Sequence, residues 1–294
     1  MQPIVERAPP KVNLTLRVLG RRTGGPHNGY HELDSLVAFA QDLADIITLT
    51  PGQNQRVTTT GPFSGSIAGE NLISVTLARI AEAAPHLTLG TVNLEKHLPI
   101  AAGIGGGSAD AAAVIRAVQR ANPAAGAAIE WTDIAACLGA DVPVCLAPRA
   151  QRMTGIGERL TAIPALPKLA AVLVNPQVPV PADKTAQVFG KLAAPPLATA
   201  PGEVSPNQFP SRAALLAHMR ITGNGLLPPA RAVVPAIDDV LAALAASRSC
   251  ELAQLSGGGP TCFGIFPDMH AAHTAAATLS QTHPTWWIRA SQLC

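Results

Sequence analysis

The chain has 294 residues, enough for about two domains of ordinary size or one large domain. Hydrophobic residues make up 48% of it and charged residues 14%, which excludes a disordered chain and predicts a compact globular one with a sizeable core. Twenty-one basic against nineteen acidic residues leave a formal net charge of +2, which argues against a surface dedicated to nucleic acid.

The N-terminus and the cysteines indicate the compartment. Glu6, Arg7 and Lys11 stand where a signal peptide needs an unbroken apolar stretch, and no window reaches about 18 uninterrupted apolar residues. The five cysteines are scattered and never spaced C-x-x-C, so we expect reduced thiols and neither a disulfide framework nor a zinc site. The sequence therefore predicts a cytoplasmic protein without a membrane partner.

The first half alternates between strand and helix patterns. Residues 11–18 place four apolar side chains on one face and four polar ones on the other, which predicts a half-buried strand. A turn rich in glycine, proline and asparagine follows it. Further strands are predicted near 35–40, 45–50 and 92–94, and helices over 71–84, 108–121 and 133–138.

The second half begins with a continuous apolar run, residues 169–174, that predicts a buried strand. Residues 192–210 are rich in proline and alanine and predict a loop or flexible linker. The remaining predicted elements are helices near 211–220, 236–247 and 269–280 and strands near 251–255, 261–266 and 285–290. We expect two α+β domains, residues 1–155 and 156–294.

The most specific local feature is the segment Pro99–Asp110, PIAAGIGGGSAD, between a strand and a helix. Its glycines leave backbone N–H groups exposed at the start of a helix, where a phosphate is the natural ligand. A Walker loop is excluded because no lysine follows the glycines. A dinucleotide-binding fingerprint fits weakly, because Ser108 takes the place of its third glycine and Glu130 lies in no predicted strand. A plain flexible turn remains the alternative.

Two further motifs accompany this loop in the same order as in a known family. Residues 8–14 read APPKVNL, and residues 255–263 read LSGGGPTCF. Together with the pattern P-x-x-x-G-x-G-x-x-S-[AS], the chain resembles the GHMP small-molecule kinases, which wrap this loop around a nucleotide triphosphate.

Additional motifs are similar to one branch of that family, whose acceptor contains a cytidine diphosphate group. They are Gly29-Tyr30-His31, the GADVP of residues 139–143 and the GIGE of residues 155–158. The sequence departs from the usual pattern at Asn28, at Gly258, in residues 224–227 and around residues 182–184. These departures put the local geometry of the second half in question more than that of the kinase core.

The resemblance implies an α+β, two-domain GHMP kinase fold. The N-terminal half resembles ribosomal-S5 domain 2 and binds ATP; the C-terminal half is ferredoxin-like and binds the substrate. It implies ATP and Mg²⁺, with the hydroxyl of Ser108 as the protein ligand of the metal. The positions similar to ATP-binding residues are Asn71, Lys96, Pro99, Ile100, Ala101, Ala102, Gly103, Ile104, Gly105, Gly106, Gly107, Ser108 and Ala109.

The resemblance also implies the catalytic residues. Asp141 resembles the general base, and Lys11 a cation beside the acceptor hydroxyl that offsets developing negative charge. From residue chemistry alone, the more common interpretation of Asp141 is a turn or cap aspartate and that of Lys11 a surface lysine.

The acceptor-binding residues follow in the same way. Tyr30 resembles a stacking partner of cytosine, His31 a partner of its polar edge, and Phe189 the opposite face of the stack. Asn13 is similar to a residue that contacts the acceptor. For Tyr30 a half-buried core aromatic is the alternative.

Two rival functions stay open at this point. A GHMP kinase of the homoserine or mevalonate type would keep the glycine loop without a cytosine site. A non-catalytic nucleotide-binding protein on the same fold would bind ATP without turnover; Lys11 and Asp141 argue against it.

Overall fold

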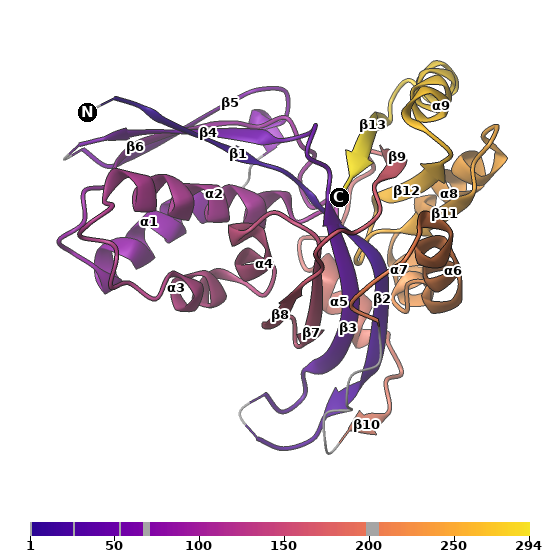
Figure 1. The fold of residues 1–294 in the computed structure, drawn as a ribbon, viewed down its shortest axis with the longest axis horizontal. Helices are drawn as coiled ribbons and strands as arrows, with labels where there is room; N and C mark the ends of the chain where they lie inside the picture. Colours follow the sequence, from indigo (N-terminus) through magenta and orange to yellow (C-terminus); the bar gives the residue numbers. More distant parts are fainter. Residues whose placement is uncertain (1, 26, 53, 67–70, 198–205) are drawn as a thin grey trace. The chain divides into compact units, whose positions relative to one another are not determined.

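The computed structural model describes residues 2–25, 27–52, 54–66, 71–197 and 206–294 (Figure 1). The chain divides into two compact units. Unit 1 comprises Met1–Lys11, Leu43–Ile100 and Gly105–Pro148, and unit 2 comprises Val12–Asp42, Ala101–Ile104 and Arg149–Cys294. The predicted division between residues 155 and 156 differs from this partition, because residues 12–42, 101–104 and 149–155 group with the C-terminal part of the chain.

Unit 1 is a four-stranded sheet with helices packed against it. Its strand order is β1 (Ile4–Ala8), β4 (Asp45–Pro51), β6 (Gly90–Glu95) and β5 (Arg56–Thr60), with only the β5–β6 pair parallel. The helical elements are η1 (Ser64–Ser66), α1 (Leu72–Ala83), α2 (Gly106–Ala121), α3 (Trp131–Leu138) and α4 (Val142–Leu146). Helix α2 packs on β1 and β4. Its buried face consists largely of alanines, which let the helix approach the sheet closely.

Unit 2 contains two sheets. The first has the order β10 (Pro196–Leu197), β2 (Lys11–Arg22), β3 (His31–Phe39), β7 (Gln151–Gly155) and β8 (Arg159–Ala162). Strand β2 is buried on both faces over residues 11–16, so the prediction of a half-buried strand is wrong there. Polar side chains that alternate with apolar ones in this strand are therefore enclosed by protein and need partners of their own.

The second sheet of unit 2 has the order β11 (Leu252–Leu255), β12 (Cys262–Phe266), β9 (Leu169–Asn175) and β13 (Trp287–Leu293), antiparallel throughout. Every residue of β9 is buried, which confirms the predicted buried strand. The associated helices are α5 (Lys184–Gly190), α6 (Arg212–Thr222), α7 (Leu227–Val233), α8 (Ala236–Ala246) and α9 (Met269–Thr282). Four strands with helices after the first and third, in the order 2-3-1-4, form the ferredoxin-like arrangement.

The predicted α+β class is confirmed, and the longer helices and strands lie where the patterns placed them. Short elements were missed, among them β1, β5, β7, β8, α4, α5 and α7. Of the predicted loop at 192–210, residues 198–205 lie outside the described residues, and residues 196–197 form β10. In the described part of the chain, no helix combines the length and apolar character needed to cross a bilayer.

Candidate functional site

The glycine loop ends at helix α2 of unit 1, as the sequence predicts. Gly105 is the N-cap residue of α2 with a left-handed φ of 63°. A Cβ at this position would lie 2.8 Å from Cγ of Lys11, so only glycine fits. The first turn of α2 presents backbone N–H groups without intrahelical acceptors and the positive end of the helix dipole. This arrangement favours an anion such as a phosphate.

Lys11 and Asp141 form an ion pair in unit 1. Lys11 Nζ lies 3.0 Å from Asp141 Oδ2, and the side chain of Asp141 is 37% exposed. Asp141 comes directly before α4, and Lys11 is the first residue of β2. The structure thus brings together the two predicted catalytic residues and Gly105 of the loop. Lys11 is buried, so it is not the surface lysine that residue chemistry alone allows.

A second lysine of unit 1 lies deeper. Lys96 Nζ lies 2.5 Å from Asp45 Oδ2 and 2.6 Å from Asp110 Oδ2, and all three side chains are buried. Asp45 also accepts hydrogen bonds from the backbone N–H groups of residues 97 and 98. These contacts tie the segment before the glycine loop to the first turns of α2.

Burial is the largest single contribution to the pKa values of Asp110 and Lys96 in this cluster. It raises the pKa of Asp110 to about 8, with the charge of Asp45 acting in the same direction and that of Lys96 opposing it. Burial lowers the pKa of Lys96, but the two carboxylates outweigh it and raise the value overall. Oδ1 of Asp110 is buried without a hydrogen-bond partner in the structure. The cluster therefore holds its protons more tightly than its isolated groups do.

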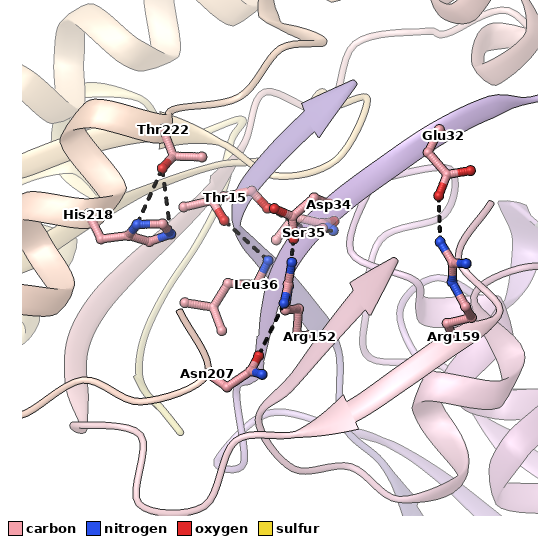
Figure 2. Close-up of polar contacts among 11 residues, drawn as sticks. Thr15, Glu32, Asp34, Ser35, Leu36, Arg152, Arg159, Asn207, His218 and Thr222 are labelled. Carbon is pink, nitrogen blue, oxygen red and sulfur yellow. Dashed lines mark hydrogen bonds and ion pairs between the residues drawn. The ribbon is translucent and has the colours of Figure 1, made fainter. Parts of the chain in front are cut away.

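Asn13 of unit 2 is held on both sides by hydroxyl groups. Its Nδ2 donates to Ser35 Oγ at 2.8 Å, and its backbone N–H donates to Ser256 Oγ at 3.2 Å. Ser35 in turn donates to the carbonyl oxygen of Thr15 at 2.6 Å, while the Thr15 hydroxyl accepts from Leu36 N (Figure 2). These bonds satisfy the polar side chains that β2 buries.

The predicted cytosine-binding residues lie in unit 2. The rings of His31 and Phe189 are 5.0 Å apart, centre to centre, at an angle of 34°. Burial, with the charge of Arg21, lowers the pKa of His31, so its neutral ring offers one donor and one acceptor. Tyr30 is 58% exposed and contacts the ring of His27, so it is not a core aromatic.

Sequence reasoning missed the ion pairs behind these residues. Glu32, which directly follows His31, is buried and lies 2.6 Å from Arg22. Its other carboxylate oxygen lies 2.5 Å from Arg159 (Figure 2). A glutamate directly after a predicted ligand was the available signal.

A second buried pair in unit 2 was missed as well. Arg152 Nε donates to Asp34 at 2.8 Å, and Arg152 Nη1 to Asn207 at 3.4 Å (Figure 2). Nothing in the spacing of these residues, 118 positions apart for the charged pair, indicates that they meet.

The remaining predicted site residues have the following surroundings. Asn71 is the N-cap of α1, where its side chain accepts from the backbone N–H of Ile73 at 3.0 Å. Ser108 lies in the first turn of α2 and is half-buried. The described residues contain no group of three or more histidine, cysteine, aspartate or glutamate side chains that could hold a metal ion. The predicted ligand roles of Asn71, Lys96 and Ser108 stay predictions.

Two family models match the chain. The model of the GHMP kinases N terminal domain matches residues 71–148, and the GHMP kinases C terminal model matches residues 211–285. The chain belongs to the GHMP kinase family. GHMP kinases use ATP as co-substrate, which agrees with a glycine loop that leads into a helix N-terminus.

Relatives of this GHMP kinase match it over almost its whole length. The 4-diphosphocytidyl-2-C-methyl-D-erythritol kinase of Rhodopseudomonas palustris is 44% identical over 98% of this chain and 96% of its own. The protein of the same name from Dinoroseobacter shibae is 47% identical, over 98% and 94%. A crystal structure of 4-(cytidine 5′-diphospho)-2C-methyl-D-erythritol kinase, 33% identical, covers 99% of both chains with a TM-score of 0.74. A homoserine kinase from Cytophaga hutchinsonii has a TM-score of 0.67 at 17% identity, which shows the shared fold alone.

Proposed function

We propose that this GHMP kinase transfers the γ-phosphoryl group of ATP to the 2-hydroxyl of 4-diphosphocytidyl-2-C-methyl-D-erythritol. The observation that supports this substrate is the 42–47% identity, over nearly the full chain, to relatives with that name. The reaction belongs to the non-mevalonate route to isoprenoid precursors, and we place it in the cytoplasm.

Lys11 and Asp141 do the chemistry in this proposal. Asp141 accepts the proton of the acceptor hydroxyl, and its 37% exposure leaves it accessible to a substrate. Lys11 orients that carboxylate and stabilises the negative charge that develops on the acceptor oxygen during transfer. The transition state of phosphoryl transfer is loose, so Asp141 serves to orient the hydroxyl as well as to ionise it.

The acceptor is recognised by its cytosine and by its alcohol part. Tyr30 and Phe189 stack on the two faces of the base, and neutral His31 bonds its polar edge. Asn13 contacts the methylerythritol part. A neutral imidazole fits this task because the edge of cytosine presents both donors and acceptors.

ATP binds to Pro99–Ala109, with Asn71 and Lys96 as further predicted contacts. Lys96 acts indirectly, because its ammonium group is already engaged by Asp45 and Asp110. Mg²⁺ neutralises the β- and γ-phosphates when it is bound. The hydroxyl of Ser108 suits a hard cation, and Mg²⁺ commonly uses one or two protein ligands beside phosphates and water. A site with few acidic residues therefore fits this metal.

The test is a coupled assay of ADP release. The purified protein is mixed with ATP, Mg²⁺ and, in separate reactions, the cytidine substrate, homoserine or mevalonate. We expect kcat/KM for the cytidine substrate to exceed the others by at least tenfold. A tenfold preference for homoserine or mevalonate would establish a different GHMP kinase. ATP binding without turnover of any acceptor would establish a non-catalytic protein.

A further inference from the structure

A buried lysine of unit 2 holds the first turn of the glycine loop. Lys184, the first residue of α5, is 6% exposed. Its Nζ donates to the carbonyl oxygen of Ala101 at 2.8 Å and also to that of Gly259. Burying an ammonium group costs free energy unless its donors are satisfied, so these two carbonyl groups are specific partners of the charge. Ala101 itself has a left-handed φ of 53°, a conformation that surrounding contacts must maintain.

Three successive carbonyl groups of the loop are held in the same way by donors of unit 2. The bonds are Lys184 Nζ to Ala101 O, Thr261 N to Ala102 O at 3.0 Å, and Ser256 Oγ to Gly103 O at 3.2 Å. A Cβ on Gly103 would lie 2.5 Å from the carbonyl oxygen of Gly259, so the loop packs directly on the turn that contains Gly259. Every carbonyl group from residue 101 to residue 103 therefore faces the body of unit 2.

The orientation of the carbonyl groups fixes that of the amides. In a trans peptide unit the C=O and the following N–H point in opposite directions. The N–H groups of Ala102, Gly103 and Ile104 consequently point away from the donors that hold the loop. None of the backbone hydrogen bonds of the described residues uses these three N–H groups. Successive backbone N–H groups that face the same side can together bind an anion.

We propose that Lys184 is a positioning residue for the nucleotide: by holding the Ala101 carbonyl on the Gly259 turn, it keeps the amides of residues 102–104 directed at the phosphates of ATP. This inference rests on the proposed function. The charge of Lys184 adds to the effect, because a cation at the C=O end of a peptide unit polarises it and strengthens the N–H end as a donor.

A purely structural role for Lys184 makes a different prediction. Helix α5 also contains Phe189, the predicted partner of the cytosine base. If Lys184 only stabilised α5, its loss would disturb Phe189 and weaken the acceptor at least as much as ATP. If it positions the loop, its loss weakens the nucleotide and leaves the acceptor nearly unchanged. The affinities of the two ligands therefore separate the two roles.

The experiment compares two variants. Lys184→Met keeps the approximate length of the side chain and removes its charge, whereas Lys184→Arg retains the charge and the hydrogen-bond donors. Lys191→Met, at an exposed lysine just after the same helix, is the matched control. Calorimetry measures the Kd of a non-hydrolysable β,γ-imido ATP analogue with Mg²⁺, and steady-state kinetics give KM for ATP and for the cytidine substrate. Thermal unfolding reports whether each variant is folded.

For Lys184→Met we expect a Kd for the analogue, and a KM for ATP, raised about tenfold or more. The KM for the acceptor should change less than threefold, and Lys184→Arg should recover part of the nucleotide affinity. Analogue binding within threefold of the wild type would overturn the proposal, as would an equal loss for both ligands. If Lys184→Met does not fold, Lys184→Gln, which removes the charge and keeps an uncharged NH₂ donor, is judged by the same criteria. Wild-type protein that binds no analogue at all would instead refute the proposed function.

Discussion

Lys11 and Lys96 both belong to unit 1, both lie near the glycine loop, and both pair with aspartate, yet their surroundings differ. Lys11 pairs with the carboxylate of Asp141, which lies 3.0 Å away and is 37% exposed. Lys96 lies between two carboxylates at 2.5 and 2.6 Å, each almost completely buried. A cation whose carboxylate partner is partly exposed can shift its interaction to a ligand, whereas one enclosed with two buried aspartates cannot do so without leaving buried acidic groups unpaired. Of the two lysines, Lys11 is therefore suited to chemistry and Lys96 to holding the loop.

The largest expected effect tests the ion pair of Lys11 and Asp141. Asp141→Asn keeps the size of the side chain and removes the charge that accepts the proton. We expect kcat to fall by about 10²–10⁴-fold, the usual contribution of a positioned general base, with little change in the free energy of unfolding. Steady-state assays and urea unfolding measure the two quantities. Asp133→Asn, at an exposed acid of α3, should leave kcat unchanged. Near-native turnover in Asp141→Asn would remove this residue from the mechanism.

Changes to the buried cluster of Lys96, Asp45 and Asp110 should lower the stability of the protein. Lys96→Met leaves Asp45 and Asp110 buried without their cation, and we expect the free energy of unfolding to fall by about 3–5 kcal/mol. Urea unfolding at pH 7 measures it. The matched control is Arg79→Met, which removes an exposed ion pair of 3.0 Å with Glu82 in the same unit. That change should cost less than about 1 kcal/mol. Equal losses for the two variants would show that burial of the Lys96 cluster has no energetic consequence.

A smaller loss of kcat is expected from a change at Lys11. Lys11→Met should lower kcat by about 10²-fold, because it removes a charge that acts mainly in the transition state. Lys11 and Asp141 act on one hydroxyl in the proposal, so the double variant should lose much less than the product of the single losses. Single-turnover measurements of the three variants test this. Fully multiplicative losses would mean that the two residues act independently.

The last expected effect concerns pH. The raised pKa of Asp110 means that the folded protein keeps a proton that the unfolded chain releases above about pH 4. The free energy of unfolding therefore falls as the pH rises from about 4 towards about 8, by at most ~1.4 kcal/mol per pH unit for one proton. Asp110→Asn is neutral at every pH and removes this contribution. Its stability relative to the wild type should rise between pH 5 and pH 8 in denaturant titrations. A constant difference would show that Asp110 is ionised throughout.

The strands and helices whose patterns depend on residues adjacent in the chain could be predicted from the sequence. The run at 169–174 is a fully buried strand, and the alanine-rich stretch at 108–121 lies in a helix that begins at Gly106. Helices α4 and α7 begin near a proline and span only five and seven residues. They are too short for a helical periodicity to be recognised in the sequence.

The candidate site was predictable only in part, for a physical reason. The motifs named Lys11 and Asp141, but the partners of Lys96 and Lys184 lie 14 to 83 positions away in the chain. No local pattern encodes such pairs, because they form only when the two strands or loops are packed together. A lysine in a strand pattern looks like a surface residue until its surroundings are known.

The last strand of unit 2 has a consequence for how the protein is made. Strand β13 closes against residues near the other end of the chain: Phe39 exchanges backbone hydrogen bonds with Cys294 at 2.9 and 3.2 Å, and Asp42 accepts from Ser291 and Gln292. On the ribosome, the strand that ends at Phe39 emerges early but must wait for about 250 further residues before these partners exist. Nascent chains of this protein therefore expose an open strand end throughout most of translation, a period in which chaperone binding can protect it from aggregation.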